Sequence, residues 1–293
     1  MIKMNSLNIM TSILLIMSMI ISGCQSSDSL NEHQVHNISS DTKAYGVFIG
    51  EDDLDKISSC AEKYDIIVIE GQQFDNEDIK ILKTKCQKVY TYLNVGSIEK
   101  YRDYYDIFKP CIIGEYENWS DEYWLDVTSE TWQEFIADKI ASELKEKGFD
   151  GFFVDNCDVY YIRNAPEIYN GLVNIIEKLR NLNSDIIING GDLFVKRLIE
   201  DKKEYLIDGI NQECVLTTIK DYDNDIFERQ SEEEKEYFIE YLNTAKNTGL
   251  KVFILEYTSD KIFAEEIKKY CAKNNFTYYI SNSIKLETSS ENG

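Results

Sequence analysis

The sequence predicts an α/β protein, and within that class a single-domain (β/α)8 barrel, also called a TIM barrel. Two observations lead to this prediction: apolar runs of strand length alternate with segments of helical pattern, and eight such runs fit into about 240 residues. A third is that carboxylates and amides stand where many of these runs end, which is where parallel barrels place their active sites. An open doubly wound sheet is the structural alternative.

The strands are expected from short runs rich in Val, Ile, Phe and Tyr that are bounded by turn-forming or charged residues. The fourth run is uncharged and bulky until it ends abruptly at Asp155, which is typical of a strand buried on both faces. In chain order the expected strands are residues 44–50, 65–70, 88–96, the run within 148–158, 185–190, 207–215, 251–257 and 276–281.

Seven segments of helical pattern separate these strands. The clearest ends at Gly148 and places apolar residues at helical spacing, namely Trp132, Phe135, Ile136, Ile140 and Leu144. The other six are expected around 54–61, 79–82, 168–179, 193–199, 232–246 and 262–272. An aromatic and partly irregular excursion, residues 101–127, interrupts the alternation after the third strand.

The amino-terminal residues predict export and membrane attachment. Residues 1–23 combine an early Lys3 with an apolar stretch too short for a good membrane span, which is typical of a signal peptide. The ending Ile21-Ser-Gly-Cys24 resembles the bacterial lipobox, in which the cysteine carries the lipid. An ordinary cleaved signal with an incidental cysteine is the alternative. We therefore expect an exported, membrane-anchored lipoprotein that faces outside the cytoplasm.

Composition sets the remaining boundaries. Residues 24–42 are polar and without apolar period, which favours a lipid-anchored flexible tether. Residues 43–285 contain no internal linker and are expected to form the barrel, followed by a disordered tail at 286–293.

Charge and residue usage exclude several classes of function. The net charge of -22 argues against nucleic acid as a partner, while an acidic surface suits a cationic substrate or serves solubility alone. The only two histidines, His33 and His36, fall in the expected tether, which removes histidine-based triads and ordinary zinc sites from the barrel. The seven cysteines form no CxxC pair, so a Cys60–Cys86 disulfide and separate buried thiols both stay open. We expect no cofactor and no metal, since no calcium-loop spacing occurs.

The polar residues at the expected strand ends describe a carbohydrate cleft. Carboxylates and amides can hydrogen-bond sugar hydroxyls, while aromatic rings such as Tyr101, Trp119 and Tyr160 can stack on sugar faces. Individually each of these residues could form a turn, lie on the surface or pack in the core. The residues expected to bind substrate are Tyr92, Asn94, Glu99, Trp124, Asn156, Asp158, Asn189, Glu256 and Tyr257. Glu70 also stands at a strand end.

Two of the carboxylates are candidates for catalysis. Cleavage of a glycosidic bond needs one carboxyl group to protonate the leaving oxygen and a second to attack the anomeric carbon or activate water. Asp155, beside Asn156, suits the ionised role, and Glu213, which follows an apolar strand, suits the proton donor. Asp158 is expected to bind substrate or to orient Asp155.

Four motifs in order resemble glycoside hydrolase family 114 and its bacterial relatives over residues 44–281. They are Tyr92-Leu-Asn-Val-Gly-Ser-Ile-Glu-Lys-Tyr-Arg102, Trp124-Leu-Asp-Val127, Lys147-Gly-Phe-Asp-Gly-Phe-Phe-Val-Asp-Asn-Cys-Asp158 and Asn211-Gln-Glu213. The resemblance implies a (β/α)8 barrel and endo-α-1,4-polygalactosaminidase-like activity on galactosamine-rich exopolysaccharides. It also implies that Asp155 is the nucleophile of a retaining mechanism and that Glu213 is the acid/base.

The expected function is therefore a surface-anchored glycoside hydrolase that cleaves exopolysaccharide containing α-linked galactosamine or N-acetylgalactosamine. Its partners would be that polysaccharide, which the acidic charge allows to be cationic, and the membrane through Cys24. Two alternatives stay open: a lipid-anchored solute-binding protein of two lobes, and a barrel that binds carbohydrate without cleaving it.

Overall fold

A computed structural model of the chain describes residues 43–117 and 119–288. The expected signal peptide, the tether and the lipidation site Cys24 lie outside the described residues, as does most of the expected tail. They stay predictions. Among the helices of the described ranges, none is long and apolar enough to cross a membrane.

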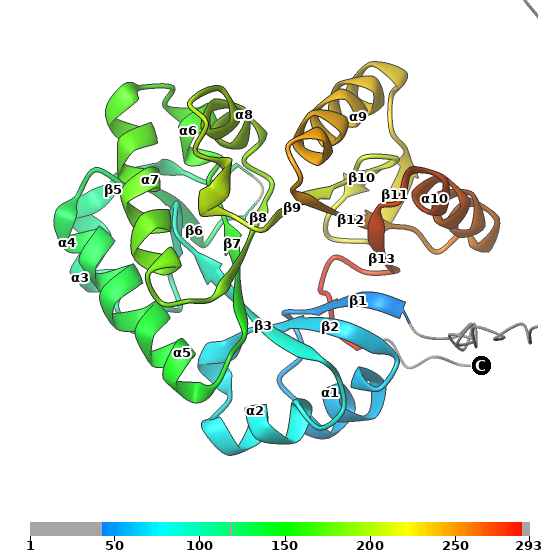
Figure 1. The fold of residues 1–293 in the computed structure, drawn as a ribbon, viewed down its shortest axis with the longest axis horizontal. Helices are drawn as coiled ribbons and strands as arrows, with labels where there is room; N and C mark the ends of the chain where they lie inside the picture. The colour runs from blue at the N-terminus through cyan, green and yellow to red at the C-terminus, as the bar shows by residue number, and fades with distance from the viewer. Residues whose placement is uncertain (1–42, 118, 289–293) are drawn as a thin grey trace, which may run out of the picture. The chain divides into compact units, whose positions relative to one another are not determined.

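The central sheet has eight strands, all parallel, and each pairs with the next one along the chain apart from inserted short strands (Figure 1). This order confirms the (β/α)8 barrel, because a doubly wound sheet reverses direction at its middle. The strands are β1 (Lys43–Phe48), β2 (Tyr64–Ile69), β3 (Lys88–Asn94), β7 (Gly151–Asp155), β8 (Asp185–Asn189), β9 (Gly209–Glu213), β12 (Lys251–Tyr257) and β13 (Thr277–Ser281).

The barrel is brought close to closure by contacts between its first and last strands. The Phe48 ring of β1 lies edge-on to Tyr279 of β13, with ring centroids 5.6 Å apart. The Gly50 N–H donates to the carbonyl of Leu286 at 3.3 Å, and the Leu286 side chain is only 3% exposed. The barrel thus includes Leu286, one residue beyond the boundary expected at Lys285.

Helices surround the sheet as the alternation predicts. The long ones are α1 (Leu54–Ala61), α2 (Asn76–Leu82), α7 (Pro166–Arg180), α8 (Asp192–Glu200), α9 (Glu232–Asn247) and α10 (Lys261–Asn274). Between β6 and β7 a continuous helical segment consists of α4 (Glu130–Gln133), a π-helical stretch η3 (Glu134–Ala141) and α5 (Ser142–Lys147). Short turns complete the set: η1 (Gly71–Gln73), α3 (Tyr105–Phe108), η2 (Lys109–Cys111), α6 (Val159–Ile162) and η4 (Glu204–Leu206).

Local sequence explains where the best-defined helices begin and end. Asp75 and Asp78 form a reciprocal capping box at the start of α2, and the Ser129 hydroxyl caps α4. Gly148 ends α5 with a φ of 107°, a conformation that favours glycine. The buried Trp132 ties this helical segment to the barrel, because its indole N–H donates to the Val95 carbonyl at 2.9 Å.

Two small antiparallel sheets follow β3 and β9 and were not expected from the sequence. The excursion after β3 contains β4 (Ser97–Glu99), β5 (Ile112–Glu115) and β6 (Glu122–Leu125), paired in the order β4-β6-β5. A hairpin of β10 (Thr217–Asp221) and β11 (Ile226–Arg229) follows β9. Both insertions leave the barrel at the carboxyl ends of strands, so they add walls to whatever site lies there.

Candidate active site

A pocket of about 330 Å³ lies at the carboxyl ends of the barrel strands. Among the residues expected at the site, eight line it: Tyr92, Trp119, Asp155, Asn156, Asp158, Asn189, Glu213 and Tyr257. The inserted sheets contribute Tyr116, Trp119 and Glu122 from one side and Ile219 and Tyr222 from the other. The remaining lining residues are Ile49, Gly190, Ile284 and Leu286.

Asp155 and Glu213 are held together by one amide between them. They are the last residues of β7 and β9, and Asn189 ends the intervening strand β8. The Asn189 side-chain N–H group donates to Asp155 Oδ1 at 2.9 Å and to Glu213 Oε1 at 2.8 Å. Because both distances start from one nitrogen, the two oxygens lie at most 5.7 Å apart. The sequence placed the three residues at strand ends, and the barrel makes them neighbours.

The backbone turns sharply directly after each of these three residues. Asn156 and Cys214 have φ values of 64° and 57°, in the left-handed region that side chains rarely adopt, and Gly190 has a φ of 61°. Such conformations concentrate at functional sites, where the surrounding structure holds them in place. Gly96 is required for a steric reason, since a Cβ at that position would lie 1.8 Å from the Asn156 carbonyl oxygen.

Tyrosine hydroxyls complete the hydrogen bonds of the two carboxyl groups. The Tyr257 hydroxyl donates to Glu213 Oε2 at 2.7 Å, and the Tyr92 hydroxyl hydrogen-bonds Asp155. Burial, followed by the negative charges of Glu213 and Glu122, raises the pKa of Asp155 to about 8. A carboxyl group with this pKa is largely protonated at pH 7.

Asp158 also lines the pocket, and its carboxylate faces the following strand end. Its Oδ2 accepts the backbone N–H of Gly191 at 3.0 Å. Burial raises the pKa of Asp158 to about 6. Within the described ranges, no hydrogen bond joins Asp158 to Asp155, and both expected roles of Asp158 stay predictions.

Asn94 and Trp124 lie behind the pocket wall. The Asn94 amide donates to Ser97 Oγ at 2.7 Å and to Glu122 Oε1 at 3.0 Å. The Trp124 ring stacks on Tyr116 with centroids 4.4 Å apart. Both were expected to touch substrate, but they support residues that line the pocket, because each is buried beneath one of them.

Glu99 and Glu256 were also expected to bind substrate, and the structure places both elsewhere. Glu99 forms an ion pair with Arg102. Glu256 is fully buried and accepts the backbone N–H groups of Leu216 and Thr217 at 2.8 and 2.9 Å. Its position on β12 explains the correction, because neighbouring residues of a strand face opposite sides, and Tyr257 is the one that faces the pocket.

The one carboxylate of the pocket that sequence reasoning missed is Glu122 of β6. It lies in the excursion at residues 101–127, where no strand was expected. The side of a sheet that its side chain faces could therefore not be predicted. Glu122 and Tyr123 are neighbours on β6 and line different pockets, as successive residues of a strand face opposite sides of a sheet.

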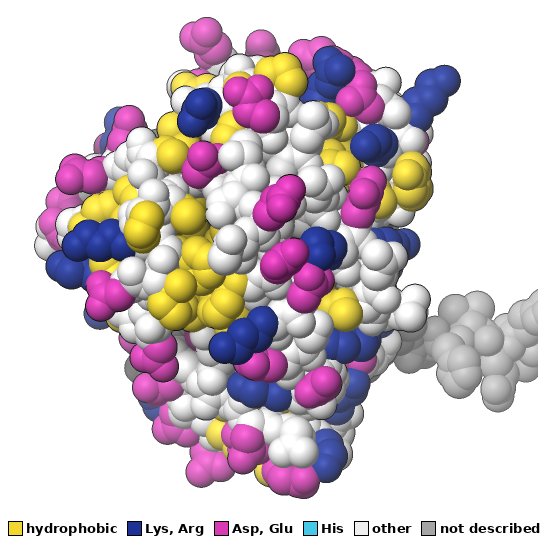
Figure 2. Space-filling model, turned by 90° about the vertical axis from the view of Figure 1, so that its left-hand side faces the viewer, with side chains coloured by type: hydrophobic (Ala, Val, Ile, Leu, Met, Phe, Trp, Pro, Cys, Tyr) yellow, Lys and Arg dark blue, Asp and Glu magenta, His cyan; other side chains and the backbone are white. Residues whose placement is uncertain are grey.

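The pocket is strongly acidic. Four carboxylates line it, from Glu122, Asp155, Asp158 and Glu213, and none of the described lining residues is a lysine, arginine or histidine. On the face shown in Figure 2, by contrast, acidic and basic side chains are interspersed. The described residues contain no group of three or more His, Cys, Asp or Glu arranged to hold a metal ion.

Comparison with known proteins identifies the family. The sequence model of glycoside-hydrolase family GH114 matches residues 39–288. The fold is similar to the glycoside hydrolase domain of PelA from Pseudomonas aeruginosa, with a TM-score of 0.68 and 16% identity, covering 84% of this chain and 96% of that one. It is also similar to Aspergillus fumigatus Ega3 in complex with galactosamine, with a TM-score of 0.62 and 18% identity, covering 85% and 93%.

A curated relative agrees over much of the barrel but is itself uncharacterized. This Methanocaldococcus jannaschii protein is 28% identical over 234 residues, which cover 71% of this chain and 64% of the relative. The chain thus spans less than two thirds of the relative's length. Since the family match covers most of the chain, including Asp155, Asn189 and Glu213, the chain belongs to glycoside hydrolase family GH114.

Proposed function

We propose that this protein is a glycoside hydrolase that cleaves exopolysaccharide containing α-linked galactosamine or N-acetylgalactosamine. The observation that carries the proposal is the pair Asp155 and Glu213, bridged by the Asn189 amide at the floor of an acidic pocket. Family membership supports the reaction class. Attachment to the outer face of a membrane through Cys24 is part of the proposal and rests on the sequence alone.

The spacing of the pair supports a retaining mechanism. Retaining enzymes hold their carboxyl groups about 5 to 5.5 Å apart, and inverting enzymes about 6.5 to 9.5 Å apart. The two bridged oxygens lie at most 5.7 Å apart, and this closeness supports the short spacing of a retaining pair. Asp155 would bond to the anomeric carbon while Glu213 gives its proton to the departing oxygen. Glu213 would then take a proton from water. The water oxygen would bond to the anomeric carbon, and the bond between that carbon and Asp155 would break.

Protonation of Asp155 links this mechanism to the charge of the substrate. A nucleophile must be ionised, whereas burial and two neighbouring carboxylates raise the pKa of Asp155 to about 8. A cationic sugar beside Asp155 would favour its ionised form and lower that pKa. Binding of a cation would therefore prepare the nucleophile.

The charge of the pocket supports an amino sugar as substrate. Four carboxylates with no basic residue among the described lining residues give a strongly negative site, which favours a cationic ligand. Galactosamine carries a protonated amine, and Ega3, a structural neighbour, was solved in complex with it. The alternative of a two-lobed solute-binding protein is disfavoured, since the described strands follow one another around a single barrel.

The test is cleavage by purified residues 25–293 of a polysaccharide that contains α-linked galactosamine. The wild type should release oligosaccharides, and Asp155→Asn or Glu213→Gln should each lower kcat by about a thousandfold or more. Glu115→Gln is the matched control, because Glu115 is exposed and lies outside this pocket. Wild-type activity in both pocket variants would overturn the assignment, and binding without cleavage by the wild type would favour the non-catalytic barrel.

A further inference from the structure

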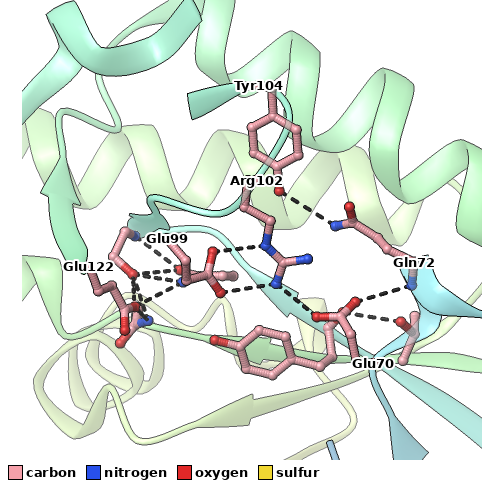
Figure 3. A network of polar contacts seen from close by, with 11 residues as sticks. Glu70, Gln72, Glu99, Arg102, Tyr104 and Glu122 are labelled. Carbon is pink, nitrogen blue, oxygen red and sulfur yellow. Dashed lines mark hydrogen bonds and ion pairs between the residues drawn. The ribbon is translucent and has the colours of Figure 1, made fainter. Parts of the chain in front are cut away.

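Glu122 is a carboxylate of the pocket that the cleavage mechanism above does not use. It reaches the pocket from β6, and three side chains donate to a single one of its oxygens. The Asn94 and Asn156 amides donate to Oε1 at 3.0 and 2.9 Å, and the Ser97 hydroxyl donates to the same atom. Glu122 is labelled in Figure 3. These donors come from the ends of β3 and β7 and from β4, so several elements fix the direction of this carboxylate.

The second oxygen of Glu122 is uncommitted. Among the described residues, none makes a hydrogen bond or ion pair to Oε2, although the side chain lines the pocket. The buried guanidinium seen in Figure 3, that of Arg102, is bonded to Glu70 and Glu99 instead. This carboxylate is held by one oxygen, its other oxygen has no hydrogen bond to a described residue, and the pocket lining contains no basic residue. Such an arrangement is suited to receive a cation.

We propose that Glu122 binds the protonated amino group of the sugar whose bond is broken, and so makes the enzyme prefer free galactosamine to N-acetylgalactosamine at that position. This inference rests on the proposed function. It identifies a residue that binds the nitrogen of the substrate. Neither the catalytic pair nor the family match assigns such a residue.

Position supports this role. Asn156 directly follows Asp155 in the chain and bonds Glu122, so the third carboxylate lies beside the nucleophile. In a 2-amino sugar, the nitrogen is attached to the carbon next to the anomeric carbon. A group that binds this nitrogen must therefore lie close to the group that attacks the anomeric carbon.

Charge supports it as well. Positive charge develops on the ring during glycosidic cleavage, and an ammonium group on the adjacent carbon opposes that development. An ionised Glu122 beside the ammonium offsets this repulsion in the transition state. An acetylated nitrogen is neutral and larger, and it would leave the Glu122 carboxylate covered without a counter-charge, which is costly for a buried ion.

The experiment compares one polymer in its deacetylated and fully N-acetylated forms. The wild type should show the higher kcat/KM on the deacetylated form. In Glu122→Gln the ratio of the two kcat/KM values should fall by about ten- to a hundredfold, the worth of a charge-assisted hydrogen bond. Glu122→Asp, which keeps the charge, should retain part of the preference, and Glu115→Gln should leave the ratio unchanged. An equal loss on both polymers in Glu122→Gln would overturn the proposal, because it would indicate support of the pocket wall alone.

A second measurement needs no turnover. In the Asp155→Asn background, binding of galactosamine and of N-acetylgalactosamine can be followed by tryptophan fluorescence, since Trp119 lines the pocket. Adding Glu122→Gln should weaken galactosamine binding about tenfold or more, whereas N-acetylgalactosamine binding should stay the same or become tighter, because no charged group is then covered. Unaltered galactosamine binding would reject the role of Glu122. This assay separates the two proposals: if the wild type cleaves neither polymer, the proposed function fails, and the assignment of Glu122 is still decided by binding.

Discussion

Two acidic clusters stand at the carboxyl ends of the barrel strands, and they differ in counter-charge. In the first, one buried guanidinium joins two carboxylates: Arg102 donates from Nη2 to Glu70 at 2.7 Å and from Nε and Nη2 to Glu99, both at 3.0 Å (Figure 3). Its side chain is only 5% exposed. In the sequence, all three residues stand at expected strand ends or within the family motifs. In the structure, their charges and hydrogen bonds are paired with one another.

The second cluster has no such cation. Asp155, Glu213 and Glu122 face the same pocket, and their hydrogen-bond donors are neutral amides and hydroxyls. The difference shows that a carboxylate at a strand end is not by itself a catalytic group. A paired carboxylate contributes to the fold. Where carboxylates lie together without a cation, the pKa values of Asp155 and Glu122 are raised, and the groups are available for chemistry.

The comparison predicts that removing the cation of the first cluster is strongly destabilising. Arg102→Leu leaves Glu70 and Glu99 buried without a partner, which should lower the free energy of unfolding by about 3 to 5 kcal/mol. Denaturant unfolding measures this. Arg197→Leu is the control, because Arg197 is exposed in its ion pair with Asp201 and should cost less than about 1 kcal/mol. A loss below that value for Arg102→Leu would show that the first cluster does not stabilise the fold.

The second cluster should respond in activity instead. Asn189→Ala removes the amide that holds Asp155 and Glu213 together, and kcat should fall about a hundredfold with little change in KM. The pH dependence of kcat should shift, because the amide favours the ionised form of Asp155. Asn174→Ala, on α7 and outside this pocket, is the control. A raised KM with unchanged kcat would mean that Asn189 binds substrate and does not position the carboxylates.

The barrel could be predicted because its determinants are local in the chain. Apolar runs and helical spacings recur within ten to twenty residues, and parallel order follows from their alternation. The sheet β4-β6-β5 and the hairpin β10-β11 could not, because their strands have only three to five residues and pair across irregular connections. Glu122 was missed with them.

For the site, the sequence could predict which residues end each strand but not which way they face. Glu256 and Tyr257 are neighbours at the end of β12, yet Tyr257 reaches Glu213 while Glu256 holds the backbone of β10. A shift of one residue in register would exchange their roles. Similarly, the position of Glu99 at a strand end could not reveal Arg102 as its partner, because that contact depends on how the excursion folds.

The last predicted effect has the opposite sign to that of Arg102. Asp155→Asn should raise the free energy of unfolding at pH 8 by at most about 5 kcal/mol, because the variant has no buried carboxyl group that must ionise or take up a proton. The pKa of Asp155 is about 8 in the folded protein and 3.8 in its ordinary state, so the folded state binds more protons between these values. Wild-type stability should therefore fall as the pH rises from about 4 to 8.

This prediction is checked by unfolding the wild type and Asp155→Asn at several pH values across that range. The variant's curve should be shallower but not flat, because burial also raises the pKa of Asp158 to about 6 and that of Glu256 to about 7. Glu115→Gln, a change of equal charge at an exposed site, should run parallel to the wild type. If the curves of the free energy of unfolding against pH were parallel for Asp155→Asn and the wild type, Asp155 would ionise without cost. The second cluster would then not differ from the first in the cost of its charges.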